Sequence, residues 1–330
     1  MLFILNKHYP KISIVTPSFN QGNFIEQTIL SIISQGYPNL EYIIIDGGST
    51  DNTLDIIKKY SDSISYWISE PDDGQSDAIR KGLLKSSGEI FNWINSDDFL
   101  APNALFNIAS AFENDIDIYC GFSQIFNDKD GIILFNHRTK LYPILEETIF
   151  NQSINQPAMF YKRSIINILG GINVSLHYIM DLELWWRYLA KFGQSRIKLG
   201  DIILSNFRLH DDSKTVSNDI QFRIEESTVL FHFCTVLETN SAFLNYFKKN
   251  GKYFSYKWDV SAISYNSFNN YLASMFIYKA YSIGDTQFCK LAFKQLLLNN
   301  KLLLNFQTLA LFVKIYIGNL SFRKYFLRNA

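Results

Sequence analysis

The sequence contains a pair of adjacent aspartates placed where a divalent cation could be held. In the stretch Glu89 to Pro102, EIFNWINSDDFLAP, an apolar run from Ile90 to Ile94 ends at the polar tip Asn95-Ser96-Asp97-Asp98. Two neighbouring carboxylates repel, and one is pushed towards protonation unless a cation joins them. A hard divalent metal with oxygen ligands, itself bridged to phosphates, is the economical partner. The alternative is a strand end followed by a plain solvated turn.

Within this tip, we expect the side chains to have different binding roles. Asp97 is the predicted metal ligand, and Asn95 and Ser96 are expected to contact a ribose or nucleotide. Asp98 is expected to act as a helper or as a helix cap.

A second polar tip, Asp46-Gly47-Gly48-Ser49, follows the apolar run Tyr42 to Ile45. The glycines permit close backbone approach, and Asp46 could accept a hydrogen bond from a base or a ribose. The pattern is not the dinucleotide-binding G-x-G-x-x-G, so a nicotinamide-dependent enzyme is disfavoured. A glycine turn that only leads into a helix is the alternative.

Two further residues have types suited to catalysis or ligand binding. Asp181 precedes Glu183-Leu184-Trp185-Trp186 at the start of a predicted helix, where the helix dipole favours an ionised carboxylate. Such a group suits a general base that takes a proton from a hydroxyl, although an N-cap aspartate looks the same. His210 ends the run Phe207 to His210 and is a candidate metal or phosphate contact, or a structural histidine.

Alternating strands and helices are expected to position these side chains. Strands followed by helices at this spacing predict a mostly parallel, doubly wound α/β sheet, whose carboxyl edge binds ligands. The predicted strands are 11–17, 42–45, 65–68, 90–94, 117–122 and 156–161, with 196–199 and 202–208 as paired strands. The predicted helices include 24–34, 74–86, 103–114 and 181–191.

Composition limits the classes of protein that fit. The chain has 330 residues, 47% of them hydrophobic, so it can bury a sizeable core. Its formal net charge is zero, which gives no argument for a nucleic-acid partner. The three cysteines lie far apart in the sequence and form no metal-binding or disulfide pattern. We expect a catalytic domain at 1–217 and a helical C-terminal region at 218–330.

The C-terminal region has an uneven charge. After Asp285 the chain carries seven basic residues and no acidic one. The apolar segment Leu302 to Ile317 in this region suits a helix at an anionic membrane surface. A helix packed on the catalytic domain or on a second subunit is the alternative, which allows for a homo-oligomer.

The sequence predicts a cytoplasmic protein, which could also bind peripherally to the inner face of the cytoplasmic membrane. The N-terminal MLFILNKHYPK is too short for a signal peptide. No run reaches the roughly 20 apolar residues of a membrane-spanning helix.

Taken in order, these segments resemble the family 2 inverting glycosyltransferases, which have the GT-A nucleotide-diphospho-sugar transferase fold. The resemblance covers Lys11 to about Thr215 and is greatest to bacterial enzymes that assemble surface polysaccharides. The segments that carry it are SIVTPSFNQGNFIEQTILSIISQGYPNLEYIIIDGGSTDNT, SEPDDGQSDAIRKGLLKSSGEIFNWINSDD, QPAMFYKRSIINILGGIN, YIMDLELWWRYLAKFG and FRLHDDSKT.

The resemblance implies a role for each matching position. Asn95-Ser96-Asp97 falls on the D-x-D motif that binds Mg²⁺ or Mn²⁺ and the donor diphosphate, with Asn95 in place of the first aspartate. Asp181 falls on the catalytic base, and His210 on a late histidine near the metal or diphosphate. Residues at positions that hold or approach the donor nucleotide are Pro17, Phe19, Asp46, Gln75 and Arg80.

The activity that the resemblance implies is transfer of a sugar from a nucleotide-diphosphate sugar to a hydroxyl of a glycan or lipid-linked acceptor, with inversion. A sugar-1-phosphate nucleotidyltransferase is the runner-up, but it needs a glycine- and arginine-rich loop where Pro17 to Asn20 stands. A non-catalytic carbohydrate-binding protein of the same fold is a third reading. The presence of both Asp97 and Asp181 argues against it.

Overall fold

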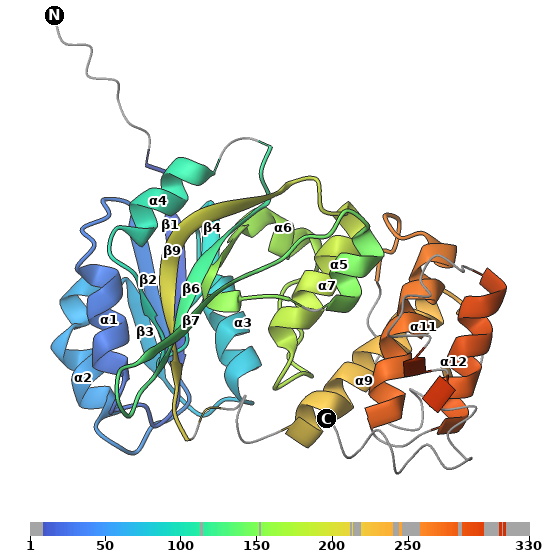
Figure 1. The fold of residues 1–330 in the computed structure, drawn as a ribbon. Helices are drawn as coiled ribbons and strands as arrows, with labels where there is room; N and C mark the ends of the chain where they lie inside the picture. Colours follow the sequence, from blue (N-terminus) through green and yellow to red (C-terminus); the bar gives the residue numbers. More distant parts are fainter. Residues whose placement is uncertain are drawn as a thin grey trace, which may run out of the picture. The chain divides into compact units, whose positions relative to one another are not determined.

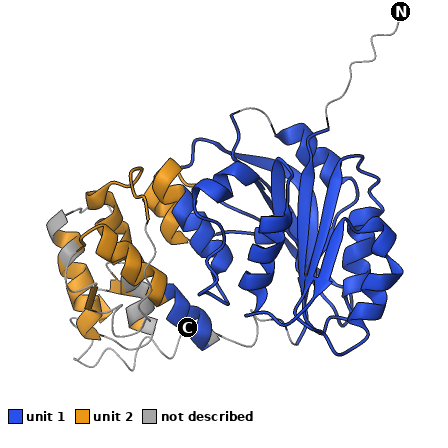
Figure 2. Ribbon diagram, turned by 180° about the vertical axis from the view of Figure 1, so that it is seen from behind, with its two compact units in different colours: residues 1–140, 153–188, 194–226 blue, residues 141–152, 189–193, 227–330 orange. Residues whose placement is uncertain are grey.

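The computed structural model describes residues 9–112, 115–151, 153–211, 213, 219–239, 244–245, 258–282, 286–299, 310–311 and 313–314. The chain divides into two compact units (Figure 2). The first comprises residues 1–140, 153–188 and 194–226, and the second comprises 141–152, 189–193 and 227–330. Most of the predicted membrane-surface segment 302–317 lies outside the described residues. The domain boundary expected after residue 217 stays a prediction.

The first half of the sheet is parallel, as its apolar runs predict. Strands β1 (Ile12–Ser18), β2 (Leu40–Asp46), β3 (Tyr66–Ser69) and β4 (Ile90–Trp93) lie in the order β3-β2-β1-β4 (Figure 1). Ser18 of β1 pairs with Asp46 of β2, and Asp46 with Ser69 of β3. The carboxyl ends of these three strands therefore meet at one edge, which is where open α/β sheets bind ligands.

The second half of the sheet mixes strand directions. Strand β8 (Met159–Lys162) runs antiparallel to both β4 and β6 (Ile118–Asn127), whereas β9 (Ile197–Leu209) is parallel to β6. The two-residue strand β5 (Phe99–Leu100) pairs with β9, and β7 (Ile133–Arg138) forms a hairpin with β6.

The expectation of two paired strands at 196–199 and 202–208 is wrong, because one continuous strand of 13 residues covers both segments. The pairing with β6 persists past Gly200-Asp201 through two shifts of register. Pairing with a neighbouring strand therefore overrides the local turn signal.

Helices cover both faces of the sheet. Ile14 of β1 packs in one cluster with Ile25 and Ile29 of α1 (Ile25–Ile33), while the next residue, Val15, points to the opposite face. There, a Cβ on Gly82 of α3 (Gln75–Lys85) would lie 2.4 Å from Val15 Cγ1, so only glycine allows this approach. Among the described residues, the other α-helices of this unit are α2 (Thr53–Lys59), α4 (Ala104–Ala111), α6 (Arg163–Ile168), most of α7 (Met180–Phe192) and the start of α9 (Asp219–Val236).

The second unit is helical where it is described. It contains α5 (Leu145–Asn151), α11 (Tyr265–Ser282) and α12 (Thr286–Asn299). The carboxylate of Glu146 accepts hydrogen bonds from the Ser264 N–H (2.9 Å) and the Ser267 hydroxyl (2.8 Å), at the start of α11. None of the helices within the described ranges is long and apolar enough to cross a membrane.

Candidate active site

Asp46 organises the glycine turn at the end of β2. Its side chain is fully buried, and Oδ2 accepts hydrogen bonds from the N–H groups of Gly48 (3.1 Å) and Ser49 (2.9 Å). The hydroxyls of Ser49 (2.5 Å) and Ser69 (2.6 Å) also donate to the carboxylate. Gly48 has φ +85°, a left-handed conformation that glycine adopts without strain. The carboxylate thus fixes the backbone that any ligand at this edge would approach.

Phe19 is presented on the surface beside this turn. It follows the buried end of β1, which includes Pro17, and its side chain is 59% exposed. The next residue, Asn20, has φ +51° and accepts a hydrogen bond from the Thr50 N–H at 2.9 Å. An aromatic ring held open at a ligand-binding sheet edge is suited to stacking against a planar base.

The tip after β4 is held by several contacts. The Gln75 side-chain amide donates to Asn95 Oδ1 at 2.7 Å, which joins the first residue of α3 to the tip. The Thr28 hydroxyl lies within hydrogen-bond distance of the carbonyl oxygens of both Ser96 (2.9 Å) and Asp98 (2.6 Å). The structure therefore brings Gln75 and Asn95 together, as the sequence predicts for two residues of one site.

Arg80 lies further along α3 than Gln75. Its guanidinium pairs with the carboxylate of Asp77, one turn earlier, at 2.9 Å, and its side chain is 43% exposed. The guanidinium group of Arg80 therefore lies at the surface of α3.

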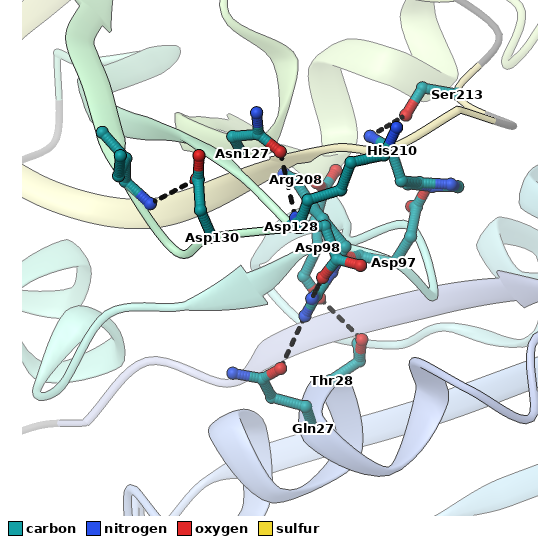
Figure 3. Close-up of polar contacts among 12 residues, drawn as sticks. Gln27, Thr28, Asp97, Asp98, Asn127, Asp128, Asp130, Arg208, His210 and Ser213 are labelled. Atoms are coloured by element: carbon teal, nitrogen blue, oxygen red, sulfur yellow. Dashed lines mark hydrogen bonds and ion pairs between the residues drawn. The ribbon is translucent and has the colours of Figure 1, made fainter.

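Asp97 and His210 meet although they are far apart in the sequence. His210 Nε2 lies 3.1 Å from Asp97 Oδ2 (Figure 3). The His210 ring also packs against Phe24, with ring centroids 4.7 Å apart. Adjacent ligands on an octahedral ion with bonds of about 2.1 Å lie about 3 Å apart, so the pair fits one Mg²⁺ or Mn²⁺ ion. Within the described ranges, no three side chains from His, Cys, Asp and Glu form a metal-binding group. Further ligands would therefore come from phosphate oxygens and water.

Arg208 is a residue of this site that the sequence reasoning missed. Its Nε donates to the Asp97 carbonyl (2.8 Å), and its terminal nitrogens bind Gln27 Oε1 (2.5 Å) and the Asp128 carboxylate (Figure 3). Its guanidinium also lies 4.9 Å from the centre of the Phe24 ring. An arginine at a strand end carries no sequence pattern, although its position two residues before His210 offered a clue.

Asp98 has a role different from a helix cap. It is almost completely buried, and its Oδ1 accepts a hydrogen bond from the Arg208 N–H at 3.0 Å. Helix α4 instead starts after Asn103, which has φ +60°. Burial, together with the neighbouring Asp97 charge, raises the pKa of Asp98 well above its usual range. Asp98 therefore ties the tip to β9 from within the protein.

Asp181 lies in the first turn of α7, as predicted. Its carboxylate accepts a hydrogen bond from the Leu182 N–H at 2.8 Å. Burial raises the pKa of Asp181 to about 6, and the charge of Glu225 acts in the same direction. A carboxylate with this pKa is ionised near neutral pH and is a stronger base than an ordinary aspartate.

The loop before α7 contacts the same end of α3 that binds Asn95. The Ser76 hydroxyl donates to the Leu176 carbonyl, and Gly74 packs against the His177 ring. Gly74, with φ +98°, and Gln75 therefore connect the tip after β4 with the segment that leads to Asp181.

Comparison with known sequences identifies a shared family. Residues 13–167 match the model of glycosyl transferase family 2. An uncharacterized glycosyltransferase of Mycobacterium tuberculosis is 34% identical over 186 residues, which cover 53% of this chain and 67% of that protein. One from Rickettsia typhi is 27% identical over 279 residues, or 76% of this chain and 84% of that protein. The chain spans only 37% of a longer Rickettsia felis relative.

Comparison with solved structures identifies the fold. Staphylococcus aureus TarS, in complex with UDP-GlcNAc, has a TM-score of 0.57 at 15% identity, over 86% of this chain and 90% of that chain. The mannosyltransferase PcManGT of Pyrobaculum calidifontis, in complex with GDP-Man and Mn²⁺, has a TM-score of 0.51 at 17% identity, over 96% and 88%. The GT-A fold class predicted from the sequence is confirmed.

Proposed function

The chain belongs to the family 2 glycosyltransferases, and we propose that it is a metal-dependent, inverting enzyme that uses a nucleotide-diphosphate sugar. The observation that carries this proposal is the approach of His210 to Asp97 at the tip after β4. An imidazole and a carboxylate at this spacing suit a divalent ion that also binds the donor diphosphate. The ion, when bound, would neutralise charge on the departing diphosphate.

The remaining proposed donor contacts surround this pair. We propose that Phe19 stacks on the base, next to Pro17, and that the turn held by Asp46 receives the ribose. Asn95, Ser96 and Gln75 would contact the nucleotide from the tip after β4 and the start of α3. Arg80, paired with Asp77 in the free protein, is proposed to lie near the nucleotide when the donor is bound. TarS and PcManGT, whose structures hold UDP-GlcNAc and GDP-Man, support a donor of this class.

Asp181 is proposed to act as the catalytic base. The acceptor hydroxyl oxygen forms a bond to the anomeric carbon while the bond from that carbon to the diphosphate oxygen breaks. Attack from the face opposite the leaving group inverts the configuration. The hydroxyl proton passes to Asp181, whose pKa of about 6 leaves it ionised and ready to accept at neutral pH.

The acceptor is proposed to be a glycan or a lipid-linked saccharide in bacterial surface-polysaccharide synthesis, on the cytoplasmic side of the membrane. The basic residues after Asp285 support contact with an anionic membrane surface, because they are not balanced by acidic ones. Flotation with anionic liposomes, comparing the full chain with a truncation near Asp285, tests this part. Equal flotation of the two would remove the membrane role.

Release of nucleoside diphosphate from a panel of UDP- and GDP-sugars, with and without Mn²⁺, tests the activity. We expect release by the wild type only with metal. Asp97→Ala should lose metal-dependent donor binding. Asp181→Asn should lose turnover but still bind UDP in the presence of Mn²⁺, as measured by calorimetry. Near-normal turnover by Asp181→Asn would refute its role as the base.

A further inference from the structure

One carboxylate from α9 binds the backbone directly ahead of α7. Glu225 Oε1 accepts a hydrogen bond from the His177 N–H at 2.7 Å. Its Oε2 accepts hydrogen bonds from the N–H groups of Tyr178 (2.8 Å) and Ile179 (3.1 Å). Three consecutive amides therefore share one anionic partner, and they end at the residue before Met180, where α7 begins.

These hydrogen bonds are charge-assisted, and they lie directly ahead of the start of a helix. Hydrogen bonds to an ionised acceptor are stronger than neutral ones, and donors ahead of a helix start lack partners within the helix. The Tyr178 ring also packs against Phe222, one turn before Glu225 on α9, with ring centroids 5.3 Å apart. The segment is thus fixed to α9 by both a polar and an aromatic contact.

The opposite side of the same segment is fixed to α3. Ser76 binds the Leu176 carbonyl, and a Cβ on Gly74 would lie 3.2 Å from His177 Nδ1. The segment 176–179 is therefore held between the start of α3 and α9, and Asp181 follows two residues later. Its backbone has little freedom to move without breaking one of these contacts.

We propose that Glu225 is a positioning residue that fixes the segment 177–179 and thereby sets the place of Asp181. This inference rests on the proposed role of Asp181 as the base. Glu225 lay outside every sequence motif, because its partners are backbone amides, which leave no trace in side-chain identity.

The charges around Asp181 agree with this role. Burial raises the pKa of Asp181, and like-charge repulsion from Glu225 of α9 adds a smaller effect in the same direction. Burial raises the pKa of Tyr161 of β8, and the Asp181 charge acts in the same direction, while the Leu182 N–H donates to Asp181 from α7. Removing the Glu225 charge should therefore lower the pKa of Asp181.

Two variants separate the effect of the Glu225 charge from the effect of its side-chain length. Glu225→Gln removes the charge and places an amide NH₂ against backbone donors, whereas Glu225→Asp keeps the charge on a side chain one methylene shorter. Glu238→Gln is the control, because it makes the same change at an exposed position just beyond α9. Amide hydrogen exchange of 176–182 and the pH profile of nucleoside-diphosphate release with Mn²⁺ are measured for all four proteins.

For Glu225→Gln we expect exchange at 177–179 to be about tenfold faster or more. The kcat should fall by about 10- to 100-fold, since small displacements of a catalytic group are costly, while KM for the nucleotide sugar changes little. In the pH profile of kcat, the midpoint of the acid limb should shift to a lower pH than in the wild type. Glu225→Asp should have an acid limb of kcat at the same pH as the wild type. Glu238→Gln should match the wild type in exchange, kcat and pH profile.

Two results would overturn the inference. Unchanged exchange at 177–179 in Glu225→Gln would show that the carboxylate does not hold the segment. Faster exchange with unchanged kcat and an unchanged acid limb would show that the segment does not govern Asp181. Absence of turnover by the wild type with every donor would instead refute the proposed function, and the exchange measurement would still decide whether Glu225 holds the segment.

Discussion

Replacing Asp181 by asparagine should abolish sugar transfer and at the same time make the protein more stable. Burial raises the pKa of Asp181 in the folded protein from 3.8 to about 6. For a carboxyl whose pKa is raised by folding, the native state binds more protons than the unfolded chain between these two values, so stability falls as pH rises through this range. A tenfold difference in proton affinity corresponds to about 1.36 kcal/mol, so the cost to folding stability reaches about 3 kcal/mol at pH 7.5 and about half of that at pH 5.

Asparagine cannot ionise and does not incur this cost, while its amide oxygen can still accept the hydrogen bond from the Leu182 N–H. Urea unfolding of wild type and Asp181→Asn at both pH values measures the difference. Tryptophan fluorescence is a suitable probe, because the buried Trp93, Trp185 and Trp186 all lie in the first unit. The variant should be more stable at pH 7.5, with the gap narrowing by about half at pH 5. A variant less stable than the wild type, or a gap independent of pH, would refute the reasoning.

Three further changes probe the same site. Gly74→Ala forces a side chain onto a residue with φ +98° and against His177, so we expect about 1–2 kcal/mol of lost stability by urea unfolding, whereas Gly131→Ala controls for φ alone at an open site. If both variants lose equal stability, the contact with His177 adds nothing to the cost of a side chain at Gly74. Arg208→Lys cannot replace contacts to Asp97, Gln27 and Asp128 together, and should lose about 2 kcal/mol and weaken Mn²⁺ binding in calorimetry. Unchanged Mn²⁺ affinity would separate Arg208 from the metal site. His210→Ala should reduce Mn²⁺-dependent UDP binding while leaving metal-free UDP binding unchanged; equal loss in both conditions would contradict a metal-ligand role.

The parallel half of the sheet was predictable because each of its strands is rich in apolar residues and is followed by polar ones. The β2 sequence Leu40–Asp46 and the β4 sequence Ile90–Trp93 are buried on both faces, so their composition alone distinguishes them from loops. The start of α7 was predictable for a similar reason, since Asp181 precedes an amphipathic run.

The second half of the sheet was harder to predict, because pairing partners decide its structure. Strand β5 has two residues and exists only through its bonds to β9, and Gly200-Asp201 looks like a turn but lies inside β9. Strand β9 keeps its extended course because β6 offers partners on both sides of that point. Local propensity contains no information on such partners.

The same limit applies to the site. Asp97, Asp181 and Asp46 could be proposed from the sequence because they end apolar runs or begin a helix, and such positions face ligands in this class of fold. Arg208 and Glu225 bind carbonyl and amide groups of the backbone, which every residue has. Their roles depend on three-dimensional proximity rather than on any spacing in the sequence.

The contact between Asp97 and His210 closes a chain segment of 113 residues. Closing a long segment is entropically costly and occurs late in folding, after local helices and neighbouring strands have formed. A bound metal ion would therefore not support one local element but would join the tip after β4 to the end of β9, across a segment that contains β5 to β8. Metal should then slow unfolding of the whole first unit, and the apo protein should open first where β9 separates from the tip after β4. A cation bound by this pair would therefore stabilise the topology of the fold in addition to its role in the proposed reaction.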